Sequence, residues 1–73
     1  MAWQDINVQF GNVLRKIREG RGLSQEYFSE LCGISRAYYG RIERGEHSAT
    51  LELCQKVSDA TGLSFAELFA DFV

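Results

Sequence analysis

Residues 24–45 read SQEYFSELCGISRAYYGRIERG, and the serines and glycines in this stretch decide how it folds. Serine is a good N-cap, so we expect one helix over Ser24–Cys32 and a second over Ser35–Arg44. Gly33 suits a left-handed turn between the two helices, and Gly45 suits the position that ends the second. The stretch therefore predicts two short helices joined by a tight turn.

The flanking sequence predicts three more helices. Apolar residues recur at helical spacing from about Asn7 to Gly20, where glycine ends the pattern. Thr50 caps a helix over Leu51–Thr61, and the capping box Ser64–Glu67 opens a last helix within residues 64–73. The side chains expected to face the core are Phe10, Val13, Leu14, Ile17, Phe28, Leu31, Cys32, Tyr39, Ile42, Leu51, Cys54, Val57 and either Ala60 or Thr61.

No segment alternates with a period of two, so the sequence predicts an all-α fold, a compact bundle of five short helices. The 73 residues form a single domain, residues 1–73. A chain of this size buries only about 60% of the surface that its unfolded form exposes, so dimerisation would add useful stability.

Composition excludes several classes of protein. No apolar run approaches a membrane span, and Met1–Asp5 lacks the features of a signal peptide, so we expect a protein of the cytoplasm, or of the nucleoid if it binds DNA. Cys32 and Cys54 form no CxxC pair and His47 is near neither, so we expect two core cysteines and no metal or cofactor. No nucleophile pair, phosphate loop or metal set indicates an enzyme.

Charge is unevenly distributed along the chain, whose formal net charge is -2. Residues 15–44 carry seven lysines and arginines against four glutamates, whereas residues 45–73 carry one lysine against five acidic residues. The predicted pair of short helices lies in the basic section and has the spacing of a helix-turn-helix, in which the second helix is free to enter the major groove of DNA. A basic patch does not require a positive total charge.

Residues 10–69 resemble the lambda-repressor-like, Cro/C1-type helix-turn-helix family (the XRE family). The stretches that carry the resemblance are Phe10-Gly11, Leu14-Arg15-Lys16-Ile17-Arg18, Gly22-Leu23-Ser24-Gln25-Glu26, Gly33-Ile34-Ser35-Arg36, Ile42-Glu43-Arg44-Gly45 and Gly62-Leu63-Ser64. Arg36, Tyr38 and Leu68-Phe69 also resemble the small controller proteins of restriction-modification systems.

The resemblance implies a set of DNA contacts, with the helix-turn-helix at about residues 24–44. Gln25 and Arg44 are expected at phosphates, and Tyr38 at the backbone or at a base edge. One face of the second helix of the motif would meet the bases, through Arg36, Ala37, Gly40 and Arg41, and Ser35 at the start of this helix is also expected at the DNA. An arginine fork fits guanine O6 and N7, although arginines on a helix face are also often simply solvated.

The resemblance also implies a structural ion pair between Arg18 and Glu43. Tyr39 stands where the family usually has an aliphatic core residue, so we expect it to be largely buried with its hydroxyl at an edge. Ser29 replaces a usual alanine. The loop with Glu46 and His47 lacks the frequent basic residues of the family, which predicts modest non-specific affinity for DNA.

The last helix carries more large apolar side chains than so small a core needs, which is typical of an interface. The predicted dimer interface is Phe65, Leu68, Phe69 and Phe72, with Leu63 and Val73 nearby. The chain is thus expected to be a homodimeric, sequence-specific transcriptional regulator that binds a palindromic site on double-stranded DNA. We expect no small-molecule effector domain, and control of its own gene is a further hypothesis. The alternative is a protein-interaction module such as an antitoxin.

Overall fold

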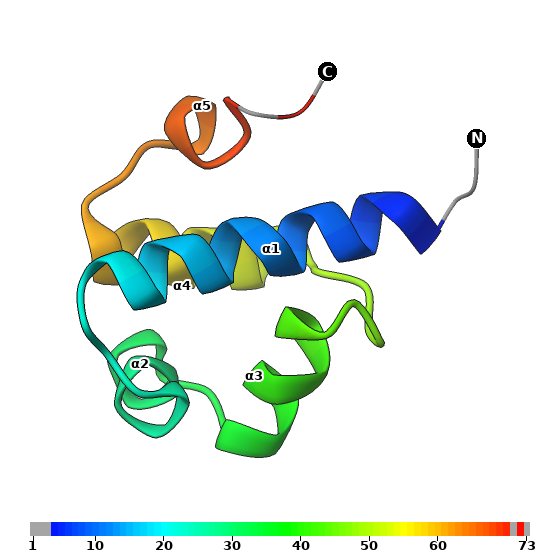
Figure 1. Cartoon of the computed structure of the whole chain (residues 1–73). Helices are drawn as coiled ribbons and strands as arrows, with labels where there is room; N and C mark the ends of the chain where they lie inside the picture. The colour runs from blue at the N-terminus through cyan, green and yellow to red at the C-terminus, as the bar shows by residue number, and fades with distance from the viewer. Residues whose placement is uncertain (1–3, 71, 73) are drawn as a thin grey trace.

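The computed structural model describes residues 4–70 and 72, and the expected interface residue Val73 lies outside them. Within this part of the chain the fold is all-α, with helices α1 (Gln4–Gly20), α2 (Gln25–Cys32), α3 (Arg36–Glu43), α4 (Leu51–Thr61) and α5 (Phe65–Leu68). Helix α5 lies on one side of α1, and α2 and α3 lie on the other (Figure 1). The predicted all-α class is confirmed.

Hydroxyl caps set where four of the helices begin. The side chains of Ser24, Ser35 and Thr50 accept hydrogen bonds from backbone N–H groups three residues later, at 3.1, 3.1 and 3.0 Å. The Ser64 side chain does the same. The Glu67 carboxylate in turn accepts a hydrogen bond from the Ser64 N–H, which completes the capping box. Because each cap satisfies N–H groups that no helix carbonyl can reach, it defines the first turn locally.

The two ends of the chain differ from the prediction. Helix α1 begins at Gln4 rather than Asn7. The apolar pattern that predicted the start does not include the residues before Asn7, and these extend the helix by almost one turn. Helix α5 is only four residues long and ends at Phe69, which has φ −104° and ψ 14°. The Phe69 ring instead stacks on Phe10 with ring centroids 5.6 Å apart and meets Phe72 edge-on, so the chain turns to build an aromatic cluster.

One hydrophobic core holds the helices together, and it consists of Phe10, Leu14, Phe28, Cys32, Tyr39, Ile42, Leu53, Cys54, Val57 and Leu68. Two expected core residues are wrong: Leu31 is 45% exposed and Leu51 is 80% exposed. Ser29 on α2 and Leu53 on α4 are buried in their place. Thr61, one of the two alternatives, is buried and donates from its hydroxyl to the Val57 carbonyl.

Close approach of α1 to α3 requires glycine at position 11. A Cβ there would lie 2.3 Å from the Glu43 carbonyl oxygen. The missing side chain lets the backbone of α1 lie directly against the C-terminal end of α3. None of the helices formed by the described residues is long and apolar enough to cross a membrane.

Candidate nucleic-acid interface

A single buried carboxylate connects the first three helices. Arg18 of α1 donates to Glu43 of α3 from Nε at 2.9 Å and from Nη2 at 3.1 Å, the pair that the resemblance implies. Gln25, the first residue of α2, donates to the same carboxylate at 2.8 Å, and the Tyr39 hydroxyl also donates to it. Because Glu43 is 3% exposed, these bonds form in a site that water barely reaches. The network holds α3 in a fixed orientation against α1 and α2.

The network also shifts the ionisation of its members. Burial raises the pKa of Glu43, but the hydrogen bonds from Arg18, Tyr39 and Gln25 together outweigh it, and the net pKa lies below that of an ordinary glutamate. Burial and the bond to Glu43 raise the pKa of Tyr39, so its hydroxyl keeps the proton that it donates. The expectation that this hydroxyl reaches the surface is wrong, because Glu43 provides a buried acceptor.

Helix α3 presents a polar face away from the core. Ser35, Arg36, Ala37 and Arg41 are exposed along this face. Among the described residues, neither Arg36 nor Arg41 forms an ion pair, so both guanidinium groups are available to an anion or a base edge. A short helix with a small residue between two free arginines has the chemistry needed to bind in a major groove.

Four other residues expected at DNA are partly engaged within the chain. Tyr38 is half-buried and meets the His47 ring edge-on, with centroids 5.3 Å apart. Gly40 is buried, and a Cβ there would lie 3.1 Å from Nη1 of Arg44. Arg44 is exposed but forms an ion pair with Glu46. Gln25 likewise has its side-chain amide on Glu43, so this amide is already engaged within the chain.

Two basic residues outside α3 have roles that the sequence did not indicate. Arg15 on α1 is exposed and has its Nε 3.8 Å from Glu43 Oε1, which adds positive charge beside the network. Arg21 instead donates to the Thr61 carbonyl at 2.9 Å and ties the end of α1 to the end of α4. Neither role has a local sequence signal, because each partner is distant along the chain.

An apolar groove of about 360 Å³ lies between the start of α1, the start of α4 and the C-terminal aromatic cluster. Its lining residues are Ile6, Asn7, Phe10, Ala49, Thr50, Leu51, Cys54, Phe69 and Phe72. Ile6 is 51% exposed, and Phe65 adjoins Phe69 with its ring centroid 6.3 Å away. Of the expected interface residues, Leu68 is buried in the core of the single chain and cannot reach a partner in this conformation.

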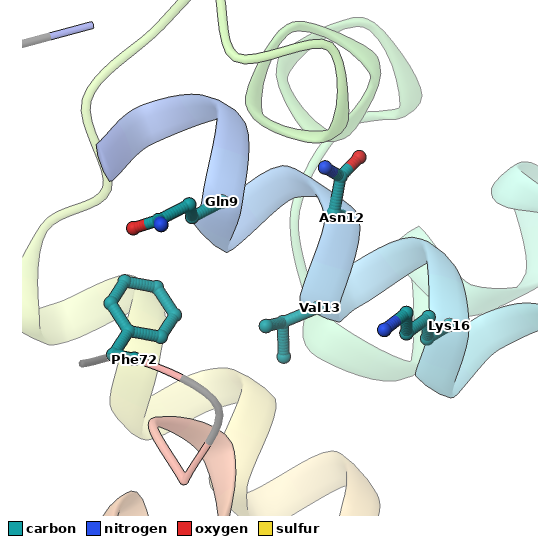
Figure 2. A pocket seen from close by; sticks show the side chains of 5 residues that line it. All are labelled: Gln9, Asn12, Val13, Lys16 and Phe72. Atoms are coloured by element: carbon teal, nitrogen blue, oxygen red, sulfur yellow. The ribbon is translucent and has the colours of Figure 1, made fainter. Parts of the chain in front are cut away.

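Phe72 borders this groove and also a second, smaller cavity. Figure 2 shows the Phe72 ring facing α1, beside the side chains of Gln9 and Val13. This second cavity has a volume of about 170 Å³ and is also lined by Asn12 and Lys16. Phe72 therefore lies against α1 and forms part of the wall of the apolar groove.

Comparisons with known proteins agree with this geometry. The helix-turn-helix family model HTH_3 matches residues 14–68. The chain is 41% identical over 68 residues to the control protein C.MunI of a Mycoplasma species, covering 92% of each chain. It is 34% identical over 65 residues to the control protein C.BamHI of Bacillus amyloliquefaciens, covering 88% of this chain and 80% of that protein.

A solved structure has the same fold over almost the whole chain. The restriction-modification controller protein C.AhdI from Aeromonas hydrophila superposes with a TM-score of 0.86 at 36% sequence identity. The match covers 94% of this chain and all of that one.

Proposed function

Because the chain belongs to the helix-turn-helix family HTH_3, we infer that it is a DNA-binding transcriptional regulator that recognises a specific sequence through α3. The observation that carries this proposal is the exposed face of α3, where two arginines form no ion pair with any residue that the structure describes, on a helix whose other face packs into the core. The family and the controller-like relatives favour this function over an antitoxin.

In this proposal Arg36 and Arg41 read bases in the major groove. Each guanidinium can bond O6 and N7 of a guanine, and each such pair discriminates against a wrong base by about 1–3 kcal/mol. Ala37, which lies between them on the exposed face, is small enough to approach a thymine methyl. The buried hydrogen bonds of Glu43 contribute by keeping α3 rigid, so that α3 loses little conformational freedom when it enters the groove.

Phosphate contacts would fix the position of α3 on the duplex. The first turn of α2 at Gln25 offers backbone N–H groups and the positive end of its dipole to a phosphate. Ser35 and Tyr38 lie beside the exposed face of α3, where hydroxyls can reach the backbone. Gly40 would allow close approach only if the Arg44 side chain above it moves.

The proposed functional unit is a homodimer, formed when the apolar groove of one chain packs against that of a second copy. Ile6, Leu51 and Phe65 are large apolar side chains that the monomer leaves exposed at or beside this groove. A patch of this kind is typical of an interface between proteins. A symmetric dimer would present two copies of α3 to half-sites about 34 Å apart, which predicts an inverted repeat in the DNA.

The two control proteins and the solved controller protein support a finer proposal, that the chain is a controller-type regulator of its own gene in the cytoplasm. In this finer proposal, regulation depends on protein concentration through dimerisation. A reporter fused to its own promoter should respond when the protein level changes, and a reporter that ignores the protein level contradicts this part of the proposal.

Selection from a randomised duplex library, followed by sequencing at two salt concentrations, tests the main proposal. We expect an inverted repeat, with binding that weakens as salt rises. Arg36→Ala and Arg41→Ala should each relax the preference at particular positions. Lys16→Ala is the matched control, because it removes the same charge from an exposed position on α1 beside Phe72 and should leave base preference unchanged. No enriched sequence and negligible binding at low salt would refute the proposal.

A further inference from the structure

The residue that follows the α3 turn is held in a fixed place. The Gly45 N–H donates to the Ile42 carbonyl at 3.0 Å, and the Glu46 N–H donates to the Arg41 carbonyl at 2.8 Å. These two bonds, with Gly45 at φ 76°, form a Schellman motif that closes the end of α3. A Cβ on Gly45 would lie 2.8 Å from Val8 Cγ2, so the turn is also packed tightly against α1. Glu46 is therefore positioned by the helix end and not by a loose loop.

From this position both carboxylate oxygens of Glu46 bind the guanidinium of Arg44. Arg44 Nε lies 3.1 Å from Glu46 Oε2, and Arg44 Nη2 donates to Oε1 at 3.2 Å. A fork of this kind is the strongest arrangement that an arginine and a carboxylate can make. The hydrogen bond from Arg44 lowers the pKa of Glu46, so the carboxylate is ionised at neutral pH.

The pair with Glu46 distinguishes Arg44 from Arg36 and Arg41, the two arginines within α3. Arg36 and Arg41 form no ion pair within the part of the chain that the structure describes, whereas Arg44 is neutralised and lies over Gly40. Glu43 faces the core, so Glu46 is the carboxylate that the end of α3 presents to solvent. The carboxylate occupies two of the five N–H groups of the guanidinium, and a phosphate that approached the others would be repelled by it.

We propose that Glu46 is a specificity-determining residue, which limits sequence-independent affinity by holding Arg44 away from the DNA phosphates. The proposal rests on the DNA-binding function inferred above and adds a negative element to it. Phosphate contacts supply essentially all of the non-specific affinity of a DNA-binding protein but only part of its specific affinity. On non-specific DNA the protein can slide until Arg44 meets a phosphate, whereas base contacts fix its position on an operator. Neutralising Glu46 should therefore strengthen non-specific binding more than specific binding.

The expected size of the effect follows from counterion release. Each added phosphate contact steepens the slope of log affinity against log salt by about 0.9, which is a loss of roughly 3.5-fold in affinity between about 50 mM and about 200 mM salt. Glu46→Gln should therefore make the slope steeper by about 0.9 per subunit. Non-specific affinity at low salt should rise several-fold, and the ratio of specific to non-specific affinity should fall.

The test measures fluorescence anisotropy on two labelled duplexes, the selected operator and a scrambled sequence of the same composition, across a salt series. Asp59→Asn is the matched control for net charge, because Asp59 is an exposed carboxylate on α4 that accepts a bond from Gln55. The decisive comparison is Glu46→Gln in an Arg44→Gln background, where the gain should disappear.

The outcomes separate this inference from the function on which it rests. A steeper slope on the scrambled duplex that depends on Arg44 supports it. An unchanged slope, a gain equal to that of Asp59→Asn, or a gain that persists without Arg44 overturns it while the wild type still binds its operator. A loss of operator affinity in Glu46→Gln also overturns it, because Glu46 would then contact DNA productively. Absence of any DNA binding by the wild type overturns both proposals.

Discussion

Replacing Glu43 by glutamine should remove much of the stability of the fold, although the two side chains have almost the same shape. The amide offers one oxygen in place of two and turns an NH₂ group toward donors. Three donor side chains from α1, α2 and α3 itself converge on this carboxylate, and Arg18 would keep its charge with only 14% of its side chain exposed. Arg18 would keep only the exposed carboxylate of Glu19, 3.7 Å away, so a poorly compensated and largely buried charge is the costly element of the change.

Removing one partner of a buried ion pair costs about 3–5 kcal/mol. A domain of 73 residues has a free energy of unfolding of about 4–11 kcal/mol, so Glu43→Gln should leave it marginally folded. At about 4–8 °C per kcal/mol, a loss of 3 kcal/mol corresponds to a fall in Tm of about 12–24 °C.

Urea unfolding followed by circular dichroism, at one protein concentration because of the proposed dimer, measures this loss. The informative partner is a triple variant, Arg18→Met, Tyr39→Phe and Glu43→Leu, which removes the charges and the buried hydroxyl together. An apolar replacement of a whole buried network is often neutral or stabilising, so the triple variant should recover most of the lost free energy. A loss below about 1 kcal/mol in Glu43→Gln, or a triple variant no more stable than the single one, would refute the reasoning about desolvation.

Three further predictions follow from the same contacts. The pKa of Glu43 is lower in the folded state than in the unfolded chain, so the stability that Glu43 contributes should be complete above about pH 4.3 and should fall as pH drops through the folded pKa. The free energy of unfolding, measured at a series of acidic pH values, should show this fall in the wild type and lack it in Glu43→Gln. Gly11→Ala should destabilise strongly because its Cβ meets backbone at 2.3 Å, whereas Gly20→Ala meets nothing within 4 Å and should stabilise by about 0.5–1 kcal/mol; equal thermal shifts would contradict the packing of α1 on α3. Leu51→Ser should weaken self-association in sedimentation and Leu31→Ser, an exposed leucine outside the groove, should not; a dimer unaffected by Leu51→Ser would place the interface elsewhere.

Local chemistry made most of the helix boundaries predictable. Ser24, Ser35, Thr50 and Ser64 each form a bond to a backbone N–H three residues later, which depends on only four consecutive residues. The left-handed turn at Gly33 is equally local, with φ 73°. Such interactions are present in the sequence itself, so composition and spacing are enough to place them.

The rotation of a helix about its axis was not predictable in the same way. On α4, Leu51 and Leu53 each form a plausible apolar stripe with Cys54 and Val57, and only packing against α2 and α5 buries Leu53. Helix α2 repeats the ambiguity, because Leu31 and the smaller Ser29 compete for one position against α3 and α4. Periodicity identifies a face to within about one residue, and the neighbouring helices decide which side is buried.

The candidate nucleic-acid interface likewise combines features that depend on neighbouring residues with features that depend on distant ones. The arginines of α3 could be named from the motif, and the resemblance implied the pair of Arg18 and Glu43. Convergence of Gln25 and Tyr39 on the same carboxylate could not be inferred, because it requires the positions of three helices. Arg44 and Glu46, by contrast, are only two residues apart, and their pairing follows from the turn at Gly45.

The two glutamates at the end of α3 explain how an acidic chain can carry a DNA-binding surface. Glu43 lies in the last turn of the helix and faces inward, where its charge is matched by Arg18 and has little effect outside the fold. Three residues later the chain has left the helix, and the reversal at Gly45 leaves Glu46 in solvent beside Arg44. The same residue type thus stabilises the fold at one position and, in our proposal, weakens phosphate contact at the other. Since these effects depend on direction and burial, the total charge of -2 has no bearing on whether α3 can bind DNA.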